Sequence, residues 1–165
     1  MRVLGIDPGI ANTGFGVVDL CAGRPSAVAA GVIETASADA LESRLACLHR
    51  DLEELFAEFG PAAVALEELY FGQNASSAMA VGQARGVVLL SAGIRGIPAS
   101  GYTPQQIKQS VCGSGRAAKE QVIEMVRTRL SLTDRPLPDH AADALAAALC
   151  HVDRAPLARA LEFAG

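Results

Sequence analysis

The chain has 165 residues, half of them apolar, and a formal net charge of −4. This length predicts one domain over residues 1–165, with a tail after about residue 153. We expect neither a membrane span nor a signal peptide, because charged side chains interrupt the apolar runs. The four cysteines lie too far apart for a zinc ribbon and predict free thiols in a reducing, cytoplasmic environment.

Three apolar runs separated by tight turns open the chain and predict an antiparallel meander of strands. These runs are residues 2–7, 14–20 and 27–33. Leucine and phenylalanine then recur at steps of three and four from Leu41 to Phe59. This spacing gives a helix one continuous apolar stripe, and Gly60 follows as its stop signal.

The second half of the chain alternates strands and helices. Short apolar runs at residues 62–67 and 97–102 predict interior strands. Helices are predicted over residues 76–95, 104–112, 117–130 and from Asp139 to about His151. Together these elements predict an α/β fold, a ribonuclease-H-like mixed five-stranded sheet flanked by helices. In such a sheet the first and fourth strands can lie side by side.

Two of these strands end on a carboxylate. Asp7 closes the first strand and Glu67 closes the fourth, so adjacent strands would bring both acids together. On the last predicted helix, His140 and Asp143 are three residues apart and share a face. Carboxylate-rich sites suit Mg²⁺ or Mn²⁺. Two such ions about 4 Å apart can activate a water and stabilise the leaving oxygen of a phosphodiester.

Each of these side chains also has a purely structural interpretation. Asp7 before Pro-Gly could be a turn residue. Glu67 and Glu68 are consecutive on a strand end, so they face opposite sides and one of them is solvated. Asp139 stands where a helix N-cap belongs, and His140 taken alone is typical of a surface histidine. The occurrence of all of them in one small chain favours a metal centre.

Charge is distributed unevenly along the sequence. Residues 1–70 carry 4 basic and 11 acidic side chains, whereas residues 71–165 carry 10 basic and 7 acidic ones. Six of the basic residues lie between positions 105 and 135, against three acidic ones. Solvated helix faces would give this pattern. An acidic metal site beside a basic surface that follows phosphates would give it too.

The sequence resembles the bacterial RuvC Holliday-junction resolvases over nearly its whole length. The likeness is carried, in order, by GIDPG at Gly5–Gly9, ALEELYF at Ala65–Phe71, GQARG at Gly82–Gly86 and HAADALA at His140–Ala146. The resemblance implies a homodimeric endonuclease that cuts four-way DNA junctions symmetrically in recombination and repair. It also implies dependence on Mg²⁺ or Mn²⁺, two ions per subunit, and action with the RuvA–RuvB branch-migration complex.

The resemblance further implies a metal-binding and catalytic role for Asp7, Glu67 and Asp143, with Glu68 as a variable neighbour. His140 stands where many members have an acid, and we retain it in the site. A neutral imidazole is a softer ligand that favours Mn²⁺ more than an all-oxygen set does. It could also act as a general acid or base.

A DNA-contacting group is implied in the same way. Tyr70 and Phe71 match loop aromatics that stack on DNA bases, and Lys108 and Lys119 match basic residues near the scissile phosphate. Arg116, from the same basic segment, joins this group as an expected DNA contact.

Other classes of protein share parts of the pattern. Sugar kinases and actin-like ATPases also place a phosphate loop after a strand aspartate, but they need a second such domain, for which this chain is too short. A catalytically silent junction-binding module would carry structural acids, and metal-dependent cleavage distinguishes it. A one-strand RNA nuclease of the same fold would not explain the aromatic loop. Nor would it explain the small-residue helix over 76–95, which we interpret as a self-packing dimer surface.

Overall fold

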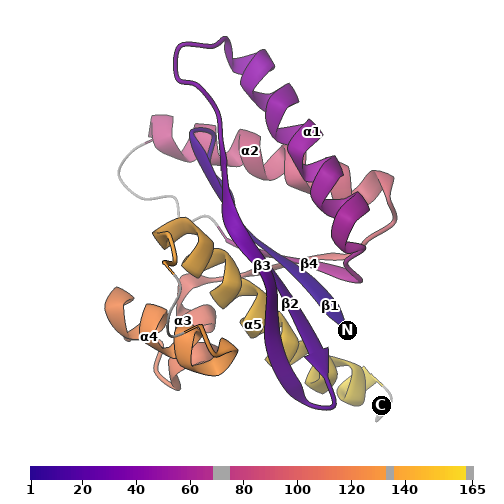
Figure 1. Cartoon of the computed structure of the whole chain (residues 1–165), viewed down its shortest axis with the longest axis vertical. Coiled ribbons are helices and arrows are strands. Elements are labelled where there is room, and N and C mark those ends of the chain that lie inside the picture. The colour runs from indigo at the N-terminus through magenta and orange to yellow at the C-terminus, as the bar shows by residue number, and fades with distance from the viewer. Residues whose placement is uncertain (69–74, 133–135, 163–165) are drawn as a thin grey trace.

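A mixed β-sheet forms the middle layer of the computed structural model, which describes residues 1–68, 75–132 and 136–162. Within these residues the sheet has five strands in the order β3-β2-β1-β4-β5 (Figure 1). The strands are β1 (Arg2–Asp7), β2 (Asn12–Cys21), β3 (Arg24–Glu34), β4 (Ala63–Glu67) and β5 (Ala99–Tyr102). The first three pair antiparallel, whereas β4 pairs with β1 and β5 with β4 in parallel. The predicted meander and the adjacency of the first and fourth strands are both confirmed.

Helices cover both faces of the sheet (Figure 1). One face packs against α1 (Leu41–Phe59) and α2 (Ala75–Ile94). The other packs against α3 (Pro104–Cys112), α4 (Lys119–Leu130) and α5 (Asp139–Glu162). Within the described ranges, no helix combines the length and the apolarity needed to cross a membrane.

Local signals explain where α3 begins and where α1 ends. The Thr103 hydroxyl accepts a hydrogen bond from the backbone N–H of Gln106, whose side chain accepts one from the N–H of Thr103, so a complete capping box starts α3. Gly60, in the left-handed conformation with φ 52°, ends α1. The expected end of the last helix near His151 is wrong. The helix continues to Glu162 through Pro156, and the Ala, Leu, Arg and Glu around that proline are good helix formers.

Alternation along β1 decides which helices each side chain meets. Leu4 and Ile6 are fully buried in the core shared with α1 and α2. Val3 lies in the opposite core, and Gly5 touches the backbone of α5. Asp7 is two residues beyond Gly5, so its side chain lies on the α5 side of the sheet.

The same alternation places the acid at the end of β4. Val64 and Leu66 belong to the core of α1 and α2, whereas Ala65 belongs to the core of α5. Glu67 therefore projects toward α5 as Asp7 does. Because Ile6 pairs with Leu66 in the parallel ladder, the two acids come from adjacent strand ends.

Glycines let α5 lie directly on the sheet. A Cβ on Gly5 would collide with the carbonyl oxygen of Ala144, and a Cβ on Gly14 would collide with that of His140. Any larger residue at either position would push the helix away. The start of α5 is therefore held against the ends of β1 and β2.

Candidate metal centre

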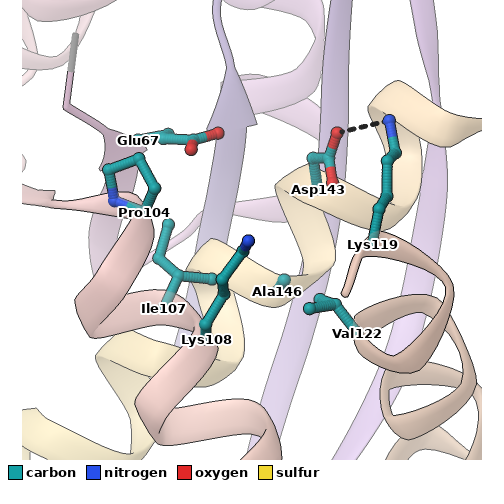
Figure 2. A pocket seen from close by; sticks show the side chains of 8 residues that line it. All are labelled: Glu67, Pro104, Ile107, Lys108, Lys119, Val122, Asp143 and Ala146. Carbon is teal, nitrogen blue, oxygen red and sulfur yellow. Dashed lines mark ion pairs between the residues drawn. The ribbon is translucent and has the colours of Figure 1, made fainter. Parts of the chain in front are cut away.

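The four predicted metal ligands come from β1, β4 and α5 and gather at one end of the sheet. The Nδ1 atom of His140 lies 2.7 Å from Oδ2 of Asp7. If Nδ1 carries the proton, it donates to the carboxylate and leaves Nε2 as an acceptor for a metal ion. Asp143 follows His140 by one helical turn and faces the same region as Glu67 (Figure 2).

The raised pKa values of Glu67 and Asp143 indicate an excess of negative charge in this region. Burial, reinforced by the nearby charges of Asp7 and Asp143, raises the pKa of Glu67 from 4.5 to about 7, although Lys108 and Lys119 oppose the shift. Burial also raises the pKa of Asp143, an effect that Lys119 opposes and Asp7 reinforces. Carboxylates that raise one another's pKa repel, so a cation between them would be stabilised.

A cavity of about 250 Å³ is lined by two of the acids and by two lysines. Glu67 lies at one side and Asp143 at the other, with Lys119 of α4 beside Asp143 and Lys108 of α3 between the two sides (Figure 2). The Nζ atom of Lys119 lies 3.4 Å from Oδ2 of Asp143 and 3.2 Å from Oδ2 of Asp139. The site thus combines acids that can hold cations with ammonium groups that can contact a phosphate.

Three carboxylates and an imidazole form a donor set that suits Mg²⁺ or Mn²⁺. Among the described residues, no three His, Cys, Asp or Glu side chains already form a closed cage for an ion. In the present arrangement His140 is directed to Asp7, and Asp143 is directed to Lys119. These side chains would have to turn away from their present partners for all four donors to meet at one centre.

The remaining predicted residues that the structure describes lie outside this cavity. Glu68 is exposed, and its carboxylate lies over Gly101 of β5, although it borders a neighbouring hollow together with Asp7, Glu67 and His140. Arg116 lines a separate polar hollow of about 690 Å³, together with Arg154. Tyr70 and Phe71 lie outside the described residues.

Two residues without an assigned role in the sequence hold the ends of the strands that carry Asp7 and Glu67. The buried Thr13 hydroxyl donates to the carbonyl oxygen of Gly9 at 2.5 Å, which closes the loop behind β1. The guanidinium of Arg85 donates to the carbonyl oxygen of Glu67 at 3.1 Å. The sequence feature that could have pointed to Arg85 is a single cation within a largely apolar helix.

Asp139 also differs from its predicted role as an N-cap. The backbone N–H of Ala142 donates to the carbonyl oxygen of Pro138, so Pro138 occupies the cap position. Asp139 is instead the first residue of α5, with its side chain 3.2 Å from Lys119. An acid in the first turn is favourable because it lies near the positive end of the helix dipole.

Comparison with known proteins gives a consistent result. The family described as "Crossover junction endodeoxyribonuclease RuvC" matches residues 3–151. Proteins of that name from Moorella thermoacetica and Thermomicrobium roseum are 47% and 51% identical. The first alignment covers 94% of this chain and 93% of the relative, and the second covers 92% of each.

A solved structure agrees over a similar extent. T. thermophilus RuvC in complex with Holliday junction substrate is 41% identical, with a TM-score of 0.90 and coverage of 96% of both chains. The carboxylate-tipped strands, the mixed sheet and the near full-length matches point the same way. The chain belongs to the RuvC family of crossover junction endodeoxyribonucleases.

Proposed function

We propose that this chain cuts four-way DNA junctions with divalent metal ions held by Asp7, Glu67, His140 and Asp143. The family consists of divalent-metal-dependent nucleases, and the T. thermophilus relative was solved with a Holliday junction. The observation that carries the proposal is the convergence of these side chains from β1, β4 and α5 at one end of the sheet, where burial and two neighbouring acids also raise the pKa of Glu67. A structural acid at a strand tip would gain nothing from this arrangement.

The donors divide into ligands and supporting groups. Asp7, Glu67 and Asp143 would supply oxygen ligands, and His140 would supply Nε2 while its Nδ1 is held by Asp7. Two bound Mg²⁺ or Mn²⁺ ions would supply an activated water and charge stabilisation for the leaving oxygen. Arg85 fixes the strand end behind Glu67.

Positive charge near the acids would orient the substrate. Lys108 and Lys119 line the cavity beside Glu67 and Asp143, at the position where a scissile phosphate would approach the ligands. Arg116 lies on the loop before α4 and would contact a more distant phosphate. Tyr70 and Phe71 follow Glu67 closely in sequence, and we assign them to base stacking near the crossover.

We further propose that α2 is the surface on which a second copy packs. Met79, Leu90 and Ile94 are 68%, 60% and 68% exposed in the single chain. A Cβ added to Gly86 on the same face would meet nothing within 4 Å. A stripe of exposed apolar residues along one helix is typical of a covered interface.

A dimer would present two identical centres, as symmetric cleavage of two strands requires. Cooperation with the RuvA–RuvB complex, and action in the cytoplasm, belong to the same proposal. The described cysteines are all free thiols, in keeping with a reducing compartment.

The direct test of the proposed function is cleavage of a synthetic four-way junction. The purified chain is incubated with the junction, and separately with a linear duplex of the same sequence, in Mg²⁺, Mn²⁺ or EDTA. We expect paired nicks in the junction that ligase can seal, only with metal, and little cleavage of the duplex. Tight junction binding without any metal-dependent cleavage would instead indicate a binding module.

A further inference from the structure

Lys119 contacts one acid of the proposed metal centre and one acid outside it. Its ammonium lies 3.4 Å from Oδ2 of Asp143 and 3.2 Å from Oδ2 of Asp139. The two acids are four residues apart, so they project from the same face of α5. The Asp143 side chain is 29% exposed, whereas that of Asp139 is 69% exposed. The ammonium therefore bridges an inner and an outer carboxylate.

This bridge conflicts with metal binding at Asp143. A divalent ion on that carboxylate would repel an ammonium in contact with the same oxygen. Lys119 is half exposed and begins α4, so its flexible stem can move the charge without moving the helix. The exposed Asp139 offers the displaced ammonium a second partner.

Lys108 provides a matched comparison. It lines the same cavity, and its charge lowers the pKa of Glu67 as that of Lys119 does. Within the described residues, however, Lys108 forms no ion pair with an acid. The two lysines thus carry equal charge and line the same cavity, but of the two only Lys119 is ion-paired with a proposed metal ligand, Asp143.

We propose that Lys119 is an internal counter-ion of Asp143 that is exchanged for a divalent cation when a DNA phosphate draws the ammonium away. This inference rests on the metal site of the proposed function. Metal and Lys119 compete for one carboxylate, whereas DNA and Asp143 compete for one ammonium. By linkage, junction binding then strengthens metal binding, and metal makes Lys119 available to the phosphate. The exchange therefore favours binding of the divalent cation at Asp143 when junction DNA is bound.

The first arm of the test measures Mn²⁺ binding to the full chain without DNA, by calorimetry. We expect Lys119→Met to bind Mn²⁺ about threefold or more tightly than wild type, because no ion pair must be broken. Lys108→Met removes the same charge and should tighten binding less. Lys119→Gln is the second variant, and thermal melting verifies that each variant is folded.

The second arm measures junction affinity in EDTA as a function of salt concentration. A lysine that contacts a phosphate contributes about one unit to the salt slope. We expect Lys108→Met to lower the slope by about that amount, and Lys119→Met to lower it clearly less, because Asp143 and Asp139 hold the ammonium in the absence of metal.

Equal Mn²⁺ affinities for the two lysine variants, or equal losses of salt slope, would overturn the exchange while leaving the metal site intact. Failure of the wild-type chain to bind Mn²⁺ at all would overturn the proposed metal centre as well. The two failures are therefore distinguishable without measuring cleavage.

Discussion

The hydrogen bond between His140 and Asp7 gives the imidazole a defined orientation. In the neutral ring, a proton on Nδ1 would be donated to the Asp7 carboxylate across this 2.7 Å contact and would leave the lone pair on Nε2. A nitrogen donor in an otherwise oxygen-rich set shifts metal preference, because Mg²⁺ favours oxygen ligands more strongly than Mn²⁺ does. His140 is thus the residue whose substitution should alter metal choice.

We predict that wild-type junction cleavage is faster in Mn²⁺ than in Mg²⁺ and that His140→Asp narrows the difference. His140→Ala should be severely impaired in either metal. Initial cleavage rates at matched metal concentrations measure both effects. If His140→Ala cleaves the junction at the wild-type rate, the His140 side chain has no role in the site beyond its place at the start of α5.

Glu67 has a consequence for stability as well as for chemistry. Its pKa rises from 4.5 to about 7 on folding, so the folded chain retains a proton that the unfolded chain releases. Between these pH values the folded state binds more protons, and the stability of the metal-free chain therefore falls as pH rises. The penalty is fully present above pH 7, where Glu67 is charged among other acids.

Glu67→Gln removes this penalty. In EDTA at pH 8 we expect the variant to melt higher than wild type, by an amount on the order of a few degrees. At pH 4.5 the difference should be much smaller, because wild-type Glu67 is then largely protonated in the folded chain. Differential scanning calorimetry at the two pH values tests this. Equal melting temperatures at pH 8 would contradict the concentration of negative charge at this site.

At the scale of elements, the position of α5 decides whether the acids meet. The helix rests on β1 and β2 only because glycine stands at the contact points, Gly5 and Gly14 among them. Gly14 lies beneath the carbonyl of His140, so it controls the first turn of α5. Displacement of catalytic groups by about 1 Å can cost about 100-fold in rate.

We therefore predict that Gly14→Ala reduces junction cleavage by about tenfold or more. Gly23→Ala is the control, because Gly23 lies in the β2–β3 turn with φ 75° and its substitution is strained. It should lower the melting temperature without changing the metal dependence of cleavage. Normal cleavage by a folded Gly14→Ala chain would contradict the role of close packing.

The exposed stripe of α2 makes a separate prediction about assembly. Leu90→Glu places a charge on the proposed dimer surface, and the Leu90 side chain is 60% exposed, so the fold itself should survive. Sedimentation should show a dimer for wild type and a monomer for the variant. A folded wild-type monomer at micromolar concentration would refute this use of the helix.

At the scale of the whole molecule, patterning predicted the architecture well. The apolar runs of the strands and the apolar stripe from Leu41 to Phe59 indicate which residues are buried, and the order of the sheet must allow that burial. The acids at Asp7 and Glu67 were visible because charge at the end of an apolar strand is unusual.

Other features could not be predicted because they depend on distant packing. The contact of Lys119 with Asp139 joins separate helices, and neither residue type indicates the pairing. The hydrogen bond from Arg85 to the Glu67 carbonyl likewise requires α2 to cross behind β4. The last helix was expected to end near His151, whereas α5 extends to Glu162 past Pro156.

The most direct measurement for the whole account is cleavage of a four-way junction by Glu67→Gln and Glu68→Gln, compared side by side in Mg²⁺ and in Mn²⁺. The two substitutions remove the same charge from adjacent residues, one facing the cavity and one exposed. We predict that Glu67→Gln binds the junction but leaves it uncut, while Glu68→Gln cuts as wild type does. Cleavage by Glu67→Gln at the wild-type rate, with Glu68→Gln inactive, would contradict the assignment of the buried acid as the metal ligand.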